Sequence, residues 1–235
     1  MFNVNPYTIE DLGSYTYMRD QIITKQDLYK QSAYLKKTNI KADVCRGPGQ
    51  IKQRQLSLDH CEGRGIALDI GARFGEWCRH LGQEFDHVFA FEPRWKWLPL
   101  LAKNVDTSNV TIYPCGLGAH YGFIGSMQGN SITKTIKYSG DILEGRMPIL
   151  PLDHFKLRNV DYIKIDVDGY ELDVLHGAIK TIKISKPVIV IEQLPEEKLR
   201  ARKIKQEPFA SGKFLENLGA TCVGNVEFDY VFKWI

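Results

Sequence analysis

A short apolar segment that runs into a glycine turn limits the folds this chain can adopt. Residues 66–70 are typical of a strand buried on both faces, with Asp69 near its end. Gly71 and Gly75 allow the backbone to turn sharply and to approach a ligand closely. Residues 74–82 then carry apolar side chains at helical spacing. This order of strand, glycine turn and helix predicts an α/β protein that binds a ligand at the turn.

The residues of the turn indicate the kind of ligand. The pattern is D-x-G-x-x-x-G, so it differs from the G-x-G-x-x-G of dinucleotide-binding proteins, and no Walker lysine follows it. A carboxylate at Asp69 would repel phosphates and attract an ammonium group. The turn therefore favours a ligand with an amino group over a pyrophosphate. The alternative is a glycine turn with a purely structural role.

A second apolar strand ends on an acidic residue. Residues 87–91 form the strand, and Glu92 follows Gly71 by 21 positions. In doubly wound folds an acidic side chain about 20 residues after the turn binds the ribose hydroxyls. We therefore predict that Glu92 binds a ribose, with Pro93 ending the strand. The alternative is a surface carboxylate.

Three ionisable residues alternate with apolar ones along a later strand, predicted over residues 162–167. Under strict pleating Lys164, Asp166 and Asp168 point to one face. Such groups are unfavourable to bury unless they are paired or bind a ligand. The segment is therefore a second candidate centre for chemistry; the alternative is a lysine–aspartate salt bridge at a sheet edge.

The next predicted strand, residues 187–191, also ends on an acid, Glu192. Neighbouring parallel strands would bring Glu192 and Asp166 together at the carboxyl edge, where open α/β sheets bind ligands. Two adjacent carboxylates suit a general base whose pKa is raised by its neighbour. They would equally suit a divalent metal ion, with Gln193 as a further oxygen ligand.

Composition and length limit the class of protein. The 235 residues are 43% hydrophobic, which supports one domain with a sizeable core plus an appendage. The net charge of +3 is too small to indicate nucleic acid by itself. No signal peptide and no membrane span are expected. The five scattered cysteines favour reduced thiols, and hence a cytoplasmic location.

The remaining elements complete the predicted organisation. Residues 1–62 are expected to form an N-terminal helical extension, with helices over 8–12 and 19–37, and residues 63–235 the main domain. Further predicted features are a third strand at 109–118 that ends in a glycine turn, a hairpin of 121–126 with 131–137, a helix capped by Asp153, and a C-terminal hairpin of 221–223 with 228–234 that turns at Gly224-Asn225.

Several of these motifs together resemble the FkbM family of S-adenosylmethionine-dependent methyltransferases. The resemblance covers roughly residues 62–235, and it rests on DIGARFG at 69–75, FEP at 91–93, PLD at 151–153, IKIDVDGYE at 163–171 and LHGA at 175–178. The motif at 163–171 is the most specific. The chain departs from the family at Asp168, where glutamate is commoner, and at Arg73, where the family usually has asparagine.

The resemblance implies a class I, Rossmann-like fold with a seven-stranded, mostly parallel sheet, a reversed C-terminal strand and helices on both faces. It implies S-adenosylmethionine as cofactor, with Asp69 and Gly71 at the methionine end, Glu92 at the ribose and Asp166 near the methyl group. The cofactor-binding residues it implies are Asp69, Gly71, Ala72, Arg73, Phe74, Gly75, Glu92, Pro93, Cys115, Gly116, Leu117 and Asp166.

The resemblance also points to O-methylation of a sugar, glycan or glycosylated metabolite. A sugar hydroxyl needs a base or a metal ion to become nucleophilic. Asp166 is the first candidate for this role and Glu192 the second, with His154 and His176 as rivals more typical of structural or surface positions. The alternative to a base is a divalent metal ion held by these carboxylates.

Two other functions stay open. The basic residues of segment 198–205 could dock an anionic acceptor, including RNA, although a solvated helix face is the simpler interpretation. An RNA methyltransferase is disfavoured by the low net charge. A non-catalytic nucleotide-binding protein is disfavoured by the joint presence of Asp69, Glu92 and Asp166. The oligomeric state cannot be read from the sequence.

Overall fold

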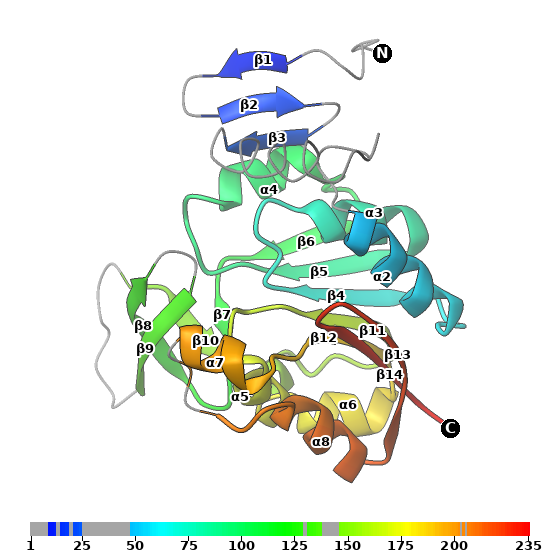
Figure 1. The fold of residues 1–235 in the computed structure, drawn as a ribbon. Helices are drawn as coiled ribbons and strands as arrows, with labels where there is room; N and C mark the ends of the chain where they lie inside the picture. Colours follow the sequence, from blue (N-terminus) through cyan, green and yellow to red (C-terminus); the bar gives the residue numbers. More distant parts are fainter. Residues whose placement is uncertain are drawn as a thin grey trace.

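The structure is a computed structural model of the chain (Figure 1). It describes residues 9–12, 15–18, 21–24, 48–128, 131–137, 146–202, 204 and 206–235. Among these residues no helix has the length and apolar character needed to cross a membrane.

A seven-stranded sheet in the order β13-β14-β12-β11-β4-β5-β6 forms the centre of the molecule. Only β14 runs antiparallel to its neighbours, so the predicted sheet with a reversed C-terminal strand is confirmed. The strands span Ala220–Val226 (β13), Asp229–Trp234 (β14), Val188–Glu192 (β12), Val160–Ile165 (β11), Ile66–Ile70 (β4), His87–Phe91 (β5) and Val110–Tyr113 (β6).

Helices cover both faces of this sheet because its strands alternate apolar side chains to both sides. On one face, α2 (Pro48–Asp59), α3 (Glu76–Glu84) and α4 (Leu98–Asn104) enclose a core with Trp77, Leu81 and Leu101. On the other, the 3₁₀ helix η1 (Leu152–Phe155), α5 (Glu171–His176), α6 (Ile179–Ser185) and α8 (Ala210–Asn217) enclose a second core. Helix α7 (Glu196–Arg202) follows β12.

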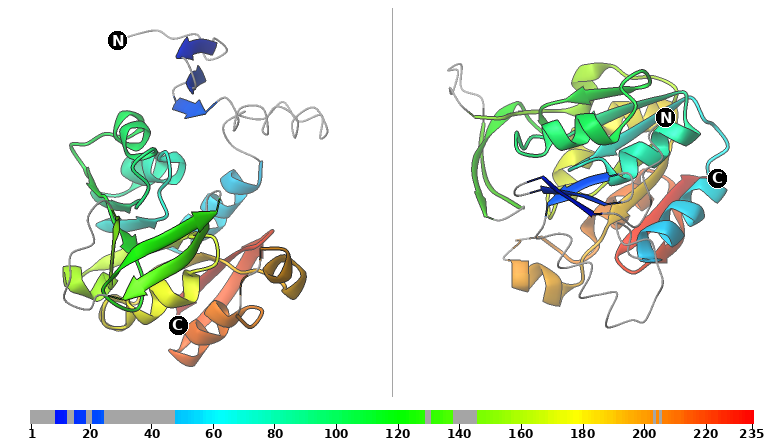
Figure 2. Two further views of the ribbon diagram at one scale, coloured as in Figure 1. Left: turned by 90° about the vertical axis from the view of Figure 1, so that its left-hand side faces the viewer. Right: turned by 90° about the horizontal axis from the view of Figure 1, so that it is seen from above.

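A small second sheet projects from this body, as Figures 1 and 2 show from different sides. Its order is β7-β10-β8-β9, built from Gly116–Leu117, Pro148–Leu150, Gly122–Gln128 and Ser131–Lys137. The antiparallel pair β8 and β9 is the hairpin predicted from the alternating sequence. Because β7 continues the chain from β6, this sheet begins beside the ligand edge of the main sheet.

The N-terminal region corrects the prediction of a helical extension. Ile9–Leu12, Tyr15–Met18 and Gln21–Thr24 form an antiparallel sheet, β1 to β3, so the helix predicted over 8–12 and the start of that over 19–37 are wrong. Branched and aromatic residues such as Ile22 and Tyr15 favour strands once they can pair. The rest of the second predicted helix lies outside the described residues.

Helix α2 packs on the main sheet, although the predicted boundary at 62/63 places it in the extension. The Ser57 hydroxyl lies 2.7 Å from that of Tyr162 in β11, and both side chains are fully buried. Gln53 and Arg54 are buried on the same helix. The division into two domains remains a prediction, and α2 covers the sheet whichever side of the boundary it is assigned to.

Two local predictions are also wrong. Asp153 does not cap the helix that begins beside it; its carboxylate accepts bonds from the backbone of Lys180 and Thr181 at the start of α6. The C-terminal hairpin turns at Glu227-Phe228 and not at Gly224-Asn225. Gly224 instead follows an irregularity in the pairing of β13, since a glycine inside a strand often marks a bulge.

Candidate active site

The glycine turn is held between two strands of the sheet. The backbone N–H groups of Gly71 and Ala72 donate to the carbonyl of Phe91 at the end of β5, at 3.0 and 3.1 Å. Gly71 has φ +86°, and a Cβ atom there would lie 2.0 Å from the backbone oxygen of Asp166 after β11. The absence of a side chain at Gly71 therefore lets three strand ends meet at one point.

Glu92 is fixed by two backbone donors. The N–H of Arg73 donates to one carboxylate oxygen at 2.8 Å and the N–H of Arg94 to the other at 2.7 Å. Glu92 is 4% exposed, and burial raises the pKa of its carboxyl while these two bonds oppose the rise. Each oxygen keeps capacity for a further bond, so a pair of ligand hydroxyls could donate to this carboxylate.

Arg73 stands where the family that the motifs resemble usually has asparagine. Its φ is +52°, in the left-handed region that asparagine tolerates and arginine adopts rarely. The guanidinium lies over the rings of Phe74, at 4.9 Å, and Trp97, at 5.1 Å. The backbone bond to Glu92 and these two ring contacts offset the strain of the left-handed conformation.

One cavity extends along the carboxyl edge from Glu92 to Tyr170. Eight of the predicted site residues line it: Gly71, Arg73, Glu92, Pro93, Cys115, Gly116, Leu117 and Asp166. Burial raises the pKa of the Cys115 thiol to about 12, so this side chain acts as an apolar wall. The cavity also has lining residues that the sequence did not single out: Arg94, Trp97 and Tyr170.

Four predicted binding residues lie behind the cavity wall. Asp69, Ala72, Phe74 and Gly75 are buried and are not among its lining residues. Gly75, at φ +93°, begins α3 and leaves room for Leu101 and Val105 of the neighbouring element. Direct contact of these residues with a ligand stays a prediction; what the structure shows is that they shape the turn.

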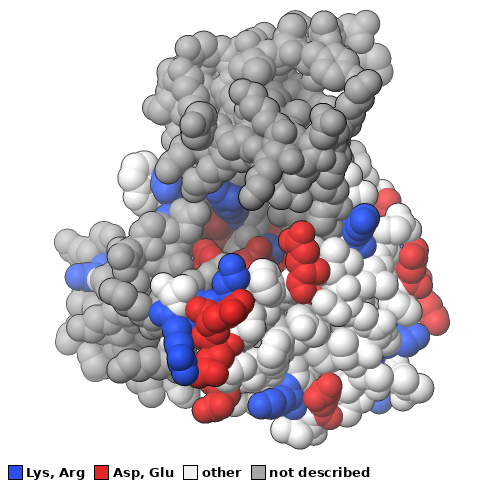
Figure 3. Space-filling view, in the orientation of Figure 1, with Lys and Arg blue, Asp and Glu red and all other residues white. Residues whose placement is uncertain are grey.

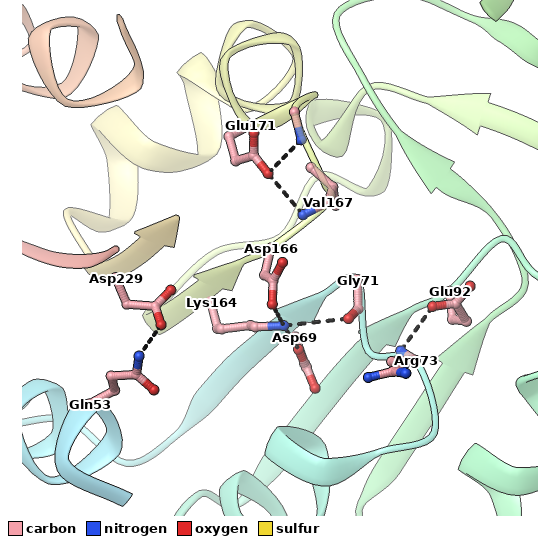
Figure 4. Close-up of polar contacts among 11 residues, drawn as sticks. Gln53, Asp69, Gly71, Arg73, Glu92, Lys164, Asp166, Val167, Glu171 and Asp229 are labelled. Atoms are coloured by element: carbon pink, nitrogen blue, oxygen red, sulfur yellow. Dashed lines mark hydrogen bonds and ion pairs between the residues drawn. The ribbon is translucent and has the colours of Figure 1, made fainter. Parts of the chain in front are cut away.

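Asp69, Lys164 and Asp166 form a charged triad (Figure 4), of which Asp166 lines the cavity. The ammonium of Lys164 is 3.4 Å from the carboxylate of Asp69 and 3.6 Å from that of Asp166. Burial opposes the charge of Lys164, but the carboxylates around it raise its pKa and keep it protonated. The alternative of a lysine–aspartate pair is thus partly correct, except that it lies at the centre of the sheet and not at an edge.

The strand after Lys164 ends sooner than predicted. β11 stops at Ile165, and Asp168 has φ +55°, so it leaves the face shared by Lys164 and Asp166. Glu171 closes the turn, because one of its oxygens accepts from the N–H groups of Val167, at 3.0 Å, and Gly169, at 3.1 Å. Burial raises the pKa of the Glu171 carboxyl to about 7 despite these bonds.

Asp166 and Glu192 lie close together, as predicted. Carboxylate oxygens of Asp166, Glu171 and Glu192 all lie within 4.8 Å of one another. Such a group could hold a cation, although the backbone bonds of Glu171 already occupy one of its oxygens. Gln193 does not assist as predicted: it is buried on the opposite side and accepts a bond from Gly212 of α8 at 2.6 Å.

The sequence prediction missed one acidic residue at this edge. Asp229 is the first residue of β14 and is the register partner of Glu192. The side-chain amide of Gln53 in α2 donates to its carboxylate, and Figure 4 shows the two facing each other. Because β14 is antiparallel, its start reaches the edge at which the other strands end. Searching only for acids at strand ends could not find it.

The rival histidines lie away from the cavity. His154 is in η1 and forms a hydrogen bond of 3.1 Å with the hydroxyl of Tyr121. His176 is exposed at the end of α5 against the ring of Phe214. Neither lines the cavity, whereas Asp166 does, so the geometry favours Asp166 over both histidines as a candidate base.

Ile204, a described residue of the basic segment 198–205, packs against the turn of the 163–171 motif. A Cβ atom on Gly169 would lie 2.3 Å from the side chain of Ile204. Arg200 and Glu196 form an exposed ion pair within α7. Over the described residues of the face shown in Figure 3, basic and acidic side chains are interspersed and form no continuous positive field.

Comparison with known proteins places the chain among methyltransferases. A model of the methyltransferase FkbM domain matches residues 69–215, from the glycine turn into α8. A search of curated proteins finds no significant match.

Similar solved structures include a methyltransferase FkbM from Methylobacillus flagellatus, with 16% identity and TM-score 0.49 over 89% of this chain. This chain spans 58% of that protein's length. An O-methyltransferase from Bacillus cereus in complex with SAH has 16% identity and TM-score 0.43, over 89% of this chain and 90% of that one. A putative RNA methyltransferase from Pyrococcus horikoshii has 17% identity and TM-score 0.46, over 81% and 87%.

Proposed function

The chain belongs to the family of FkbM methyltransferases, and we propose that it transfers a methyl group from S-adenosylmethionine to a hydroxyl oxygen of a sugar, glycan or glycosylated metabolite. One observation carries the cofactor part of this proposal. A glycine turn, an anchored carboxylate at Glu92 and the carboxylate of Asp166 border a single cavity. The acceptor class rests on the resemblance of the sequence motifs to the family.

The residues present fit S-adenosylmethionine at two points. Gly71 forms a cradle that a Cβ atom would fill, since that atom would lie 2.0 Å from the oxygen of Asp166. Glu92 presents a carboxylate whose oxygens accept ligand hydroxyls, and the ribose of the cofactor carries two. We assign the adenine to the wall formed by Cys115, Gly116 and Leu117.

When bound, this cofactor supplies a methyl group on a positively charged sulfur, which needs no further activation. The chain must then position the acceptor hydroxyl and remove its proton. Asp166 lines the cavity, and we assign to it the orientation of the hydroxyl, with Glu192 as the second catalytic carboxylate. A divalent metal held by Asp166 and Glu192 is a further part of the proposal that a chelator tests directly.

The charge of the acceptor edge favours a sugar over RNA. The carboxylates of Asp166, Glu192 and Asp229 gather there, and the ammonium of Lys164 already pairs with Asp69 and Asp166. A phosphate chain would be repelled by this edge, whereas carboxylates accept hydrogen bonds from neutral hydroxyls. We further propose a cytoplasmic location, because the buried cysteines Cys61, Cys78 and Cys115 are free thiols.

The test is methyl transfer from S-adenosyl-L-[methyl-³H]methionine to a mixture of methyl glycosides of glucose, galactose, mannose and rhamnose. Parallel reactions contain excess EDTA, or a single-stranded RNA in place of the glycosides. We expect label in the glycosides and none in the RNA. Label in the RNA alone would contradict the acceptor class, and loss of transfer with EDTA would establish the metal.

A further inference from the structure

Tyr170 lines the cavity but has no role in the proposed function. It precedes α5 as the N-cap residue of that helix, and its side chain is partly buried. The cavity extends from Glu92 to this residue. An aromatic ring in such a wall offers a flat apolar surface to a planar group of a ligand. The position of α5 indicates which part of the ligand that group is.

Helix α5 is anchored to the chain that leaves the wall of residues 115–117. The N–H of Ala119 donates to the carboxylate of Asp173 in α5 at 3.2 Å. A Cβ atom on Gly177, at the end of the helix, would lie 2.0 Å from the carbonyl oxygen of Gly118. Helix and chain therefore meet at two points, and the second requires a residue without a side chain.

The wall and α5 also share one apolar core. Cys115 and Leu117 belong to the buried cluster that contains Val174 of α5. Burial and, to a smaller extent, the nearby carboxylate of Asp173 raise the pKa of the Tyr170 hydroxyl. Tyr170 is therefore a neutral phenol at physiological pH, and it lies beside the helix residue that holds the chain after the wall.

The charged triad lies on the other face of the sheet. The ammonium of Lys164 is 6.0 Å from the ring of Trp77 in α3, and Asp166 pairs with it at 3.6 Å. Helix α3 covers the face opposite to that covered by α5. Tyr170 and Asp166 therefore approach the cavity from opposite faces, although only four positions separate them. This geometry groups Tyr170 with the wall of residues 115–117 and not with the candidate base.

We propose that the ring of Tyr170 packs against the adenine of S-adenosylmethionine and, with the wall of residues 115–117, forms the pocket for this base. The inference rests on the proposed function, in which the cofactor occupies the cavity with its ribose at Glu92. Every nucleobase has a π-face that an aromatic side chain can contact. Gly177 of the motif at 175–178 then has a role, because it lets α5 approach the segment that follows this wall.

Calorimetric titration with S-adenosylhomocysteine tests this contact without an acceptor. Tyr170→Ala should bind roughly 10- to 100-fold more weakly than the wild type, because it loses the contact with the base. Tyr170→Phe keeps the ring and should bind within about threefold of the wild type. 5′-Methylthioadenosine carries the adenine and the ribose but not the amino acid. Its affinity should therefore fall by the same factor in Tyr170→Ala.

Tyr121→Ala is the matched control for that variant. Tyr121 is 49% exposed, forms a hydrogen bond of 3.1 Å with His154 and does not line the cavity. This variant should bind S-adenosylhomocysteine within about twofold of the wild type. If Tyr170→Ala does not fold, Tyr170→Leu takes its place as the variant that lacks the ring.

Three calorimetric results would overturn the proposal. They are binding by folded Tyr170→Ala within about threefold of the wild type, a loss in Tyr170→Phe equal to that in Tyr170→Ala, or an unchanged affinity of Tyr170→Ala for 5′-methylthioadenosine. Absence of S-adenosylhomocysteine binding by the folded wild type is a different failure, because it would refute the cofactor itself and this inference with it.

Methyl transfer to the glycoside mixture gives a second readout. We expect Tyr170→Ala to raise the KM for S-adenosylmethionine and to leave the KM for the glycoside within about twofold of the wild-type value. A raised KM for the glycoside with an unchanged KM for the cofactor would assign Tyr170 to the acceptor and overturn the proposal. If the wild type methylates none of the glycosides, the sugar proposal fails, and the calorimetric titration still decides the role of Tyr170.

Discussion

The two halves of the ligand edge are built in different ways. The half at β4 and β5 is local: the glycine turn and Glu92 follow directly from their own strands, and backbone N–H groups hold the carboxylate. The half at β11, β12 and β14 is assembled from distant parts of the chain. Gln53 of α2, Asp166 after the end of β11 and Asp229 of β14 meet only in the folded protein. We infer that the half at β4 and β5, the proposed cofactor half, is fixed by local backbone geometry. The half at β11, β12 and β14, the proposed acceptor half, is fixed by long-range packing.

Lys164 joins the two halves, and its replacement should have the largest effect on stability. Lys164→Met would leave the fully buried Asp69 without its counter-charge. Breaking a buried ion pair in this way costs about 3–5 kcal/mol. Urea denaturation measures the loss. The double variant Asp69→Asn, Lys164→Met should recover most of it, and an equal loss in both variants would show that packing, not charge, is responsible.

Gly71→Ala should have the next largest effect, because it would push the two halves apart. The new Cβ atom would meet the backbone oxygen of Asp166 at 2.0 Å, at a φ of +86°. We expect a loss of about 3 kcal/mol in unfolding free energy and weaker binding of S-adenosylhomocysteine.

Gly219→Ala is the matched control for that variant. Its φ is +97°, but nothing lies within 4 Å of the new atom. It should cost only about 1 kcal/mol for the backbone conformation and leave ligand binding unchanged. Equal losses in the two variants would mean that the close approach at Gly71 has no special role.

The half at β11, β12 and β14 should make the stability of the protein depend on pH, through Asp229. The ordinary pKa of Asp229 is 3.8, and in the folded protein it is about 7. Between these values the folded state binds more protons than the unfolded state. The stabilisation that comes from this proton is therefore fully present below pH 3.8 and is lost as the pH rises through about 7.

Asp229→Asn removes that dependence. From pH 4 to pH 8, the unfolding free energy of the variant should rise by about 2 kcal/mol relative to that of the wild type. This is roughly half of what the full pKa shift would give for a carboxyl without access to water, because solvent screens the charge. Glu171, whose pKa is about 7, contributes the same pH dependence to the stability of both proteins. Denaturation curves at several pH values test this, and parallel pH profiles for the two proteins would contradict it.

A surface variant should have the smallest effect. Arg200 and Glu196 form an exposed pair one helical turn apart in α7. Arg200→Ala should change stability by less than about 0.5 kcal/mol and should leave binding of S-adenosylhomocysteine unchanged. A large loss of binding would show that the basic segment belongs to the cofactor half.

The same contrast explains which features the sequence could predict. The glycine turn, Glu92 and the central parallel strands are local patterns, and the structure contains them. The convergence of Asp166 and Glu192 followed from one topological rule and also occurs. Asp229 was missed because its strand is reversed, and Gln53 because nothing in its own helix points to a distant carboxylate.

Failed predictions have similarly specific causes. Asp153 looked like the cap of its own helix, but it caps α6, which follows in the chain after β11 and α5. The residues of β1 to β3 have helical periodicity in places, and strand pairing outweighs it. Asp168 departs from strict alternation because the strand ends before it. The errors at Asp153 and Asp168 arose where a partner distant in sequence, or the end of an element, decided the local conformation. The strands β1 to β3, by contrast, pair with near neighbours in sequence.

Calorimetric titration with S-adenosylhomocysteine of the wild type, Glu92→Ala and Asp229→Asn tests the central claim most directly. Glu92→Ala removes charge-assisted bonds worth about 1.5–3 kcal/mol each, so its affinity should fall roughly 10- to 100-fold or more. Asp229→Asn should bind within about twofold of the wild type. Equal loss of affinity in both variants, or no binding by the folded wild type, would contradict a cofactor half that is separate from the acceptor half.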